Sequence, residues 1–177
     1  MAQPGPERPG GVRRRTVFQR FVTLTALLAT MEAHLQPRPS MGGETMQDGL
    51  LVVASAHDVA ASLDRIAEVA AEAGFRPVVR VDHALSAAEV GMQLRPTVLL
   101  LLANPQGGTP LMRCDQRVGI ELPLRVLAWE DETGQVKVAI GDPSGLEQRF
   151  ELGDICGEPL ARLRAITGRL LDSVRRP

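Results

Sequence analysis

Aromatic side chains are scarce in this chain, and it has no net positive charge. It has no tyrosine, one tryptophan and four phenylalanines, so aromatics make up 3% of its 177 residues, and its formal net charge is −1. Nucleic-acid binding needs a basic surface, and single strands also need aromatic rings for stacking. We therefore expect no nucleic-acid partner. The core must consist of aliphatic side chains, which supply most of the 44% hydrophobic content.

Cysteine and histidine are also few. Cys114 and Cys156 are the two cysteines, they form no C-x-x-C pair, and the three histidines do not cluster with them in the sequence. A structural zinc site needs about four ligands, so we expect no metal and no other cofactor. Two lone cysteines leave both free thiols and a disulfide open.

Long apolar runs are missing as well. A helix that spans a bilayer needs roughly 20 apolar residues, and the run at residues 21–29 is far shorter, so we expect no integral membrane segment. Four arginines at positions 13–20 precede this run, so that residues 13–29 together have the outline of a secretory signal. A disordered tail and a later translation start, at Met41 or Met46, stay open. In each case we expect residues 1–48 outside the fold, and a cytoplasmic protein unless residues 13–29 act as an export signal.

Several short apolar segments are typical of strands. They are Leu50–Ala54, 77–81, Thr97–Ala103, 126–130 and 135–140. Thr97–Ala103 is apolar at every position after the threonine, which predicts a strand buried on both faces or central in its sheet. The last two segments flank turn residues 131–134 and predict an antiparallel hairpin.

Helices are predicted between these strands. Ser55 lies three residues before Asp58, and Ser86 three before Glu89, so each pair predicts a capping box that opens a helix. A short helix is expected around residues 146–150. The last helix begins at residues 157–159, where a first-turn proline costs no hydrogen bond.

The predicted order is therefore β-α-β-α-β-loop-β-β-α. It indicates an α+β fold, a two-layer α/β sandwich with a mixed or antiparallel sheet. We assign residues 49–152 to the α/β domain and residues 153–177 to a C-terminal helix that packs on it.

The segment at residues 95–124 carries the densest turn chemistry. A buried strand ends at Asn104-Pro105, two glycines follow at 107 and 108, and Thr109-Pro110 predicts a helix N-cap followed by proline at the first position. A loop that ends a strand and opens a helix is a common ligand site, so Asn104, Gly108 and Thr109 are candidate ligand-binding residues. A purely structural turn is the alternative.

Three further side chains are candidates. His83 follows Asp82, whose carboxylate could orient an imidazole or merely fix a turn. Cys114 lies between Arg113 and Asp115, whose opposing charges predict neither a reactive nor an inert thiol. Glu121 is flanked by apolar residues, so it is either buried with a raised pKa or paired with an arginine such as Arg95 or Arg125.

Six motifs that occur here in order carry a resemblance to a known family. They are residues 82–84 (DHA), 94–97 (LRPT), 104–112 (NPQGGTPLM), 119–124 (GIELPL), 129–134 (WEDETG) and 142–143 (DP). Together they resemble the bacterial family called domain of unknown function 302, over roughly residues 49–152. The resemblance implies a small homodimeric α/β domain and no established activity. Members often have glycine where this chain has Ala103, and Arg-His where it has Arg149-Phe150.

Three functions follow as hypotheses. The first is a homodimeric, non-enzymatic module that binds a small ligand near residues 104–112, which requires a pocket there. The second is a hydrolytic or redox enzyme that uses His83, Glu121 or Cys114, which requires two of these side chains to converge. The third is a structural or partner-binding domain.

Overall fold

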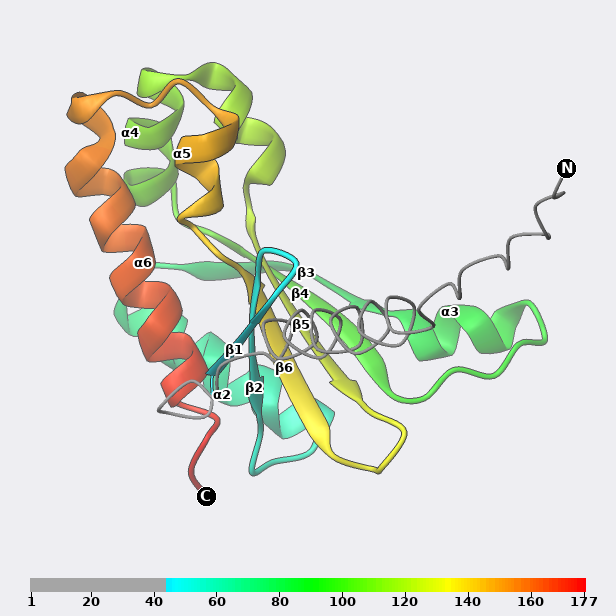
Figure 1. Ribbon diagram of the computed structural model, residues 1–177. Coiled ribbons are helices and arrows are strands. Elements are labelled where there is room, and N and C mark those ends of the chain that lie inside the picture. The colour runs from blue at the N-terminus through cyan, green and yellow to red at the C-terminus, as the bar shows by residue number, and fades with distance from the viewer. Residues whose placement is uncertain (1–43) are drawn as a thin grey trace, which may run out of the picture. The chain divides into compact units, whose positions relative to one another are not determined.

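A single six-stranded sheet organises residues 44–177, the range that the computed structural model describes (Figure 1). The strand order is β1-β2-β6-β5-β4-β3, and every neighbouring pair is antiparallel. The strands are β1 (Glu44–Gln47), β2 (Leu50–Ala54), β3 (Arg76–Asp82), β4 (Thr97–Ala103), β5 (Leu124–Glu130) and β6 (Val136–Gly141). The hypotheses about the leader fall on residues outside this range, except for residues 44–48.

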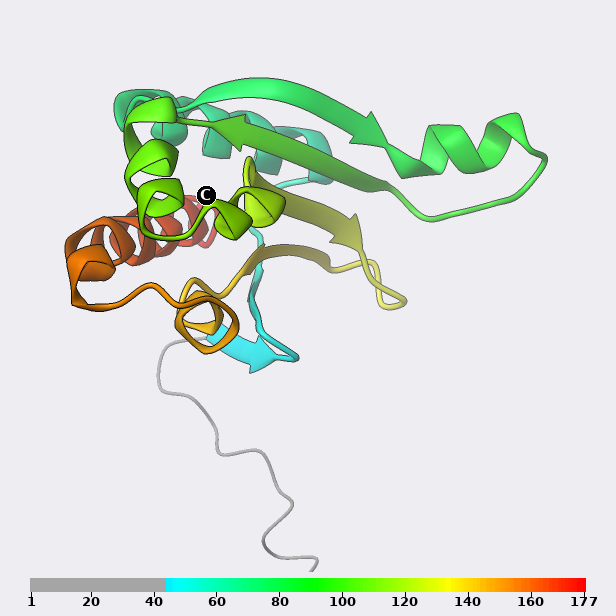
Figure 2. The ribbon, with the colours of Figure 1, turned by 90° about the horizontal axis from the view of Figure 1, so that it is seen from above.

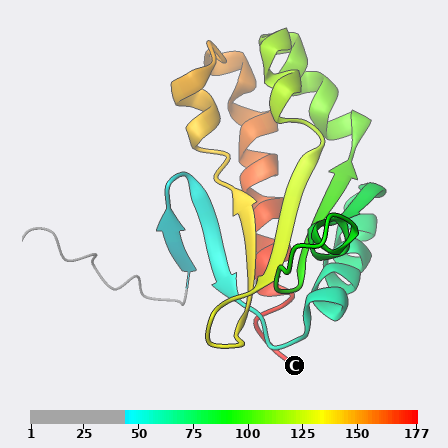
Figure 3. The same cartoon turned by 90° about the vertical axis from the view of Figure 1, so that its right-hand side faces the viewer.

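The helices form the second layer, as predicted for an α+β sandwich. They are α2 (Val59–Glu72), α3 (His83–Glu89), α4 (Pro105–Cys114), α5 (Gly145–Arg149) and α6 (Gly157–Asp172), with 3-10 turns η1 (Gln116–Glu121) and η2 (Asp154–Cys156). Helices α2 and α6 lie behind one face of the sheet (Figure 3). The elements α4, η1, α5 and η2 gather at one end, whereas α3 stands well apart from them (Figure 2).

Two hydrophobic clusters fill the interior. The sheet cluster comprises Val53, Val59, Leu63, Ile66, Ala70, Leu100, Leu102, Leu124, Val126, Ala128, Val136, Val138, Ile140, Ile166, Leu170, Leu171 and Val174. The helical cluster comprises Leu111, Val118, Leu146, Leu152, Cys156 and Leu160. Leu163 of α6 packs against both. Burial of each large aliphatic side chain stabilises the fold by roughly 1.5–3 kcal/mol.

Strand β4 is an inner strand, paired with β3 and β5, which confirms the predicted alternative of a central position, whereas the other alternative, burial on both faces, is wrong. Leu100 and Leu102 are fully buried against the helices, while Leu99 and Leu101 are only half-buried. Because successive side chains of a strand point to opposite faces, the helices can cover only one of the two leucine rows.

Strand β1 corrects the expectation that residues 1–48 lie outside the fold. Residues 44–47 pair antiparallel with β2, from Glu44 opposite Val53 to Gln47 opposite Leu50. The connection is Asp48-Gly49, and both residues have positive φ, 50° and 78°. An Asp-Gly pair with this backbone is a favoured two-residue hairpin turn. The turn therefore recruits four residues before the predicted domain boundary.

Both predicted capping boxes are displaced. Helix α2 is capped by Asp58, which accepts a hydrogen bond from Ala61 N at 2.7 Å, and α3 is capped by Asp82. Ser55 is instead buried and hydrogen-bonded to Ser62 Oγ at 2.7 Å. An aspartate directly before a helix offers the same acceptor as serine, so the nearer residue takes the position in both cases.

The remaining elements confirm the predictions. Strands β5 and β6 form the hairpin around residues 131–135, with Val126 opposite Ile140 and Glu130 opposite Val136. Helix α5 covers residues 145–149. Helix α6 begins at Gly157 and contributes Ile166, Leu170 and Leu171 to the core.

Candidate functional site

Helix α4 begins five residues earlier than predicted. Asn104 is its N-cap, its Oδ1 accepts a hydrogen bond from Gly107 N at 3.1 Å, and Pro105 occupies the first turn. Pro110 therefore lies inside the helix, where it removes one backbone hydrogen bond. Two internal glycines each cost about 1 kcal/mol relative to alanine, which is why the sequence predicted a loop. Burial of Leu111, which is 1% exposed, favours the helix.

Asn104 also joins α4 to the end of α2. Its Nδ2 donates a hydrogen bond to Ala73 O at 3.1 Å, and Ala73 is the C-cap of α2. Gly108 lies close to the chain that follows η1, because a Cβ placed on it would be 3.1 Å from Leu122 Cδ1. The start of α4 is thus held on both sides.

A cavity of about 780 Å³ opens between α4 and α6, over the ends of β4 and β5. Its apolar lining includes Phe75, Leu102, Leu111, Met112, Leu124 and Ile166. Its polar lining includes Asn104, Gln106, Thr109, Glu158, Arg162 and Arg169. We call this cavity the α4–α6 pocket. A largely apolar cavity with a few polar groups, of a size between about 300 and 1,000 Å³, is typical of small-molecule sites.

The predicted ligand candidates divide around this pocket. Asn104, Gly108 and Thr109 line it, together with the rest of residues 104–112. His83, Cys114 and Glu121 are not among its lining residues. Sequence reasoning missed the contribution of α6, including Arg162 and Arg169, because only the tertiary fold brings that helix beside α4.

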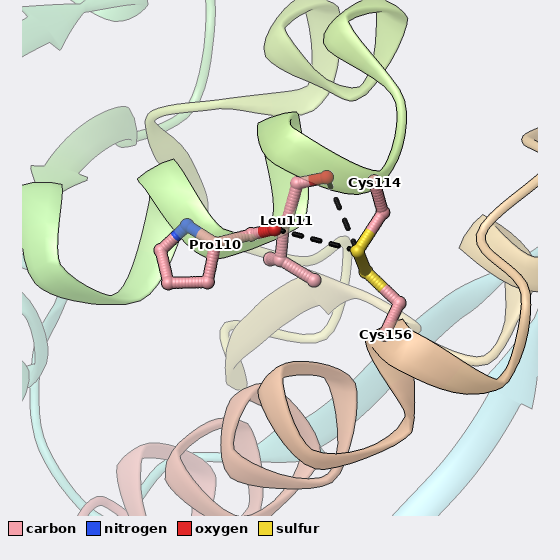
Figure 4. Close-up of a disulfide and its surroundings, with 4 residues drawn as sticks. All are labelled: Pro110, Leu111, Cys114 and Cys156. Carbon is pink, nitrogen blue, oxygen red and sulfur yellow. Dashed lines mark hydrogen bonds between the residues drawn. A yellow bond between two sulfur atoms is a disulfide. The ribbon is translucent and has the colours of Figure 1, made fainter.

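Cys114 forms a disulfide with Cys156, with the two Cα atoms 6.1 Å apart. Figure 4 shows that the bond joins the end of α4 to the residue before α6, and its sulfurs lie 3.4 Å from Pro110 O and 4.0 Å from Leu111 O. A disulfide carries no thiolate, which is the nucleophilic form of cysteine. Cys114 is therefore a link between the two walls of the pocket.

Glu121 is held by two arginines. Its Oε2 accepts a hydrogen bond from Arg125, and Arg149 Nη1 lies 2.7 Å from its Oε1. The predicted alternative of pairing with Arg125 is confirmed. Arg149 also lies over the ring of Phe150, 5.3 Å from its centroid. Glu121, Arg125 and Arg149 line a second cavity of about 450 Å³, where the Glu121 carboxylate is already bonded to the two arginines.

His83 lies far from these groups. Asp82 pairs with Val98 at one end of the β3–β4 ladder, whereas Arg76 pairs with Ala103 at the end from which α4 starts. The length of β4, roughly 17–20 Å at about 3.3 Å per residue, separates His83 from Asn104. The Asp82 carboxylate accepts a hydrogen bond from Leu85 N at 2.9 Å, so it caps α3. His83 therefore does not converge with the candidate residues at the α4 end of the sheet.

Across residues 44–177, no three His, Cys, Asp or Glu side chains are grouped so that they could hold a metal ion. None of the helices described is long and apolar enough to cross a membrane.

Comparison with known proteins gives a family and a fold. Residues 51–170 match the family described as "Domain of unknown function DUF302". An uncharacterised conserved DUF302 protein from Bacillus stearothermophilus has a similar structure, with a TM-score of 0.66 and 20% sequence identity over 73% of this chain and all of that one. This similarity concerns the fold alone.

Two curated relatives share a segment with the chain. Proteins named fluoride-specific ion channel FluC 1 from Brucella suis and Brucella abortus are each 44% identical over 108 residues. That segment is 61% of this chain and 42% and 40% of the respective relatives. The chain thus spans less than half the length of these proteins.

Proposed function

The chain belongs to the DUF302 family, and from this premise we propose that it is a non-enzymatic module that binds a small molecule in the α4–α6 pocket. The observation that carries the proposal is the pocket itself, a cavity of about 780 Å³ walled by residues 104–112 of the predicted ligand segment. Had that segment been packed shut, the hypothesis would have failed.

The walls of the pocket support binding of a ligand without large rearrangement. Asn104 ties the start of α4 to the end of α2 through the Ala73 carbonyl oxygen. The Cys114–Cys156 disulfide ties the end of α4 to the start of α6. Since a preformed site loses less conformational entropy when its ligand binds, two fixed walls favour affinity.

The competing hypotheses receive less support. An enzyme that uses His83, Glu121 or Cys114 needs side chains within hydrogen-bond reach, and these three lie apart or are already bonded to other groups. Channel activity is named for proteins of which the matched segment makes up less than half, and it is not transferred to this chain. The occurrence of such a segment within a longer protein supports a module that serves other domains. Homodimer formation stays part of the proposal, to be measured by light scattering.

The proposal can be tested with a neutral apolar fluorophore, N-phenyl-1-naphthylamine, as the probe. We expect saturable fluorescence enhancement, and shifts in the ¹⁵N–¹H spectrum of residues 104–112. Ala165 lines the pocket, whereas Ala161 on the same helix is exposed and lies outside its lining. Ala165→Trp should therefore reduce binding at least about tenfold, since added bulk cannot be accommodated in an occupied cavity, while Ala161→Trp should not.

Two results would contradict the proposal. One is the absence of saturable probe binding to the full chain. The other is equal binding to both tryptophan variants, because the probe would then bind elsewhere.

A further inference from the structure

The α4–α6 pocket combines an apolar interior with a charged wall on one helix. Leu102 and Leu111 are buried at its base, with exposed fractions of 0% and 1%. The charged side chains of its lining are Glu158, Arg162 and Arg169, all on α6. Their formal charges sum to +1, while the rest of the lining is neutral. The inference drawn from this arrangement rests on the proposed function.

The two arginines differ in how their charge is balanced. Arg162 Nη2 lies 2.5 Å from Glu158 Oε1, and both residues line the pocket, so this pair contributes no net charge. Arg169 Nη2 lies 3.4 Å from Glu72 Oε2, and Glu72 is outside the lining. The charge that remains within the pocket therefore belongs to Arg169.

Arg169 can exchange its partner at little cost. The side chains of Arg169 and Glu72 are 58% and 69% exposed, and ion pairs this exposed to solvent contribute little to stability. A guanidinium group presents five donors in a planar fork that fits a carboxylate with two parallel hydrogen bonds. A ligand carboxylate at the mouth would thus compete well with Glu72.

We infer that the pocket selects amphipathic monocarboxylates. The apolar tail lies between α4 and α6 against Leu102, Leu111 and Ile166, and the carboxylate is bound by Arg169. An uncharged ligand of the same shape would bury the same apolar surface but would lack this ion pair. A cationic ligand would be repelled by the positive charge of Arg169. Selectivity therefore follows the sign of the head group.

Three ten-carbon compounds test the inference by displacement of N-phenyl-1-naphthylamine at low ionic strength. They are decanoate, decanol and decyltrimethylammonium, which share a tail length and differ in charge. We expect decanoate to bind about tenfold more tightly than decanol, as for a charge-assisted hydrogen-bonded pair, and the cation to bind most weakly. Direct titration of ¹⁵N-labelled protein with decanoate should shift resonances of residues 104–112 and of α6.

Matched arginine variants locate the head group. Arg169→Gln should reduce decanoate affinity about tenfold, to the level of decanol, and leave decanol unchanged. Arg164 lies on the same helix, pairs with Glu147 and is outside the lining, so Arg164→Gln should change neither. Glu158→Gln should strengthen decanoate binding, because it raises the summed charge of the lining.

The outcomes separate the two proposals. If Ala165→Trp weakens decanol binding but decanoate binds no more tightly than decanol, the proposed charge selectivity is wrong. The proposal that the α4–α6 pocket binds small molecules would still hold. Equal losses in Arg169→Gln and Arg164→Gln would overturn the role of Arg169 in the same way. If neither the fluorophore nor any of the three compounds binds, the proposed function itself fails.

Discussion

The sheet cluster and the helical cluster hold their elements together by different means. The sheet cluster has 17 buried residues drawn from β2, β4, β5, β6, α2, α6 and the chain just after α6, and no covalent link. The helical cluster has six buried residues, and one of them is Cys156 of the disulfide. A small core buries too little apolar surface to be stable alone, and disulfides commonly compensate for this. Burial of apolar side chains therefore stabilises the sheet cluster, whereas the helical cluster depends also on the disulfide, which restricts the unfolded chain.

The α4–α6 pocket lies where the two clusters meet. Leu102 and Ile166 in its lining belong to the sheet cluster, Leu111 belongs to the helical cluster, and Leu163 packs against both. The disulfide fixes the distance between the two walls there, so the constraint that stabilises the helical cluster also shapes the pocket.

The largest expected effect comes from the sheet cluster. Leu100→Ala removes a side chain that is 1% exposed between the sheet and the helices, so it should lower the free energy of unfolding by about 2–5 kcal/mol. Leu99→Ala, one residue away on the less covered face, should cost less than half as much. Urea denaturation measures both, and equal losses would show that both leucine rows are equally buried.

The disulfide gives the next largest effect. The disulfide joins two cysteines that are 42 positions apart in the sequence. The Cys114→Ser/Cys156→Ser double variant removes this link and should lower the free energy of unfolding by about 2–4 kcal/mol. Hydrogen exchange should accelerate mainly in α4, η1 and η2, because these elements contribute to the helical cluster. Exchange in β4 and β5 should change little. Uniform acceleration across both regions would mean that the two clusters unfold as one unit.

The same contrast explains how much the sequence could predict. Regular patterns predicted the five strands β2 to β6 and the helices α2 and α6, because apolar periodicity reflects burial in the large core. Strand β1 was missed because its four residues, ETMQ, lack the alternation of a half-buried strand, although Asp48-Gly49 carried a hairpin signal. In the helical region the sequence predicted a loop and a cap at Thr109, where α4 instead starts from Asn104.

The candidate site was predicted in part for a related reason. Asn104, Gly108 and Thr109 are adjacent in sequence, so local turn chemistry could identify them. Arg162 and Arg169 are more than 50 residues further on, and only the packing of α6 beside α4 brings them to the pocket. The pairing of Cys114 with Cys156 stayed open because two cysteines alone do not determine their redox state.

A smaller effect is expected at Asn104, which serves both regions. Asn104→Ala removes the cap of α4 and leaves the Ala73 carbonyl oxygen without this donor, so it should cost about 1 kcal/mol. Asn104→Asp keeps an acceptor for Gly107 N but loses the donor to Ala73. If thermal unfolding shows the aspartate variant to be as stable as the wild type, the bond to α2 contributes nothing.

The smallest effect is an acid dependence confined to the helical region. The hydrogen bond from the Arg117 side chain, with that from its backbone N, lowers the pKa of Asp115 from its ordinary value of 3.8 to about 2. A carboxyl group whose pKa is lower in the folded state than in the unfolded state stabilises the fold fully above the unfolded pKa. This contribution is lost as the pH falls from about 4 through about 2. Asp115→Asn should therefore flatten the decline of the melting temperature between these values.

The pKa of Asp131 in the β5–β6 turn is lowered as well, chiefly by the Thr133 hydroxyl, so Asp131→Asn should flatten the same decline. Hydrogen exchange at acid pH distinguishes the two, because protonation of Asp115 should release η1 while the hairpin stays protected. If acid instead opens β5 and β6 first, the sheet region is the more acid-sensitive part of the molecule and the contrast between the clusters does not extend to pH.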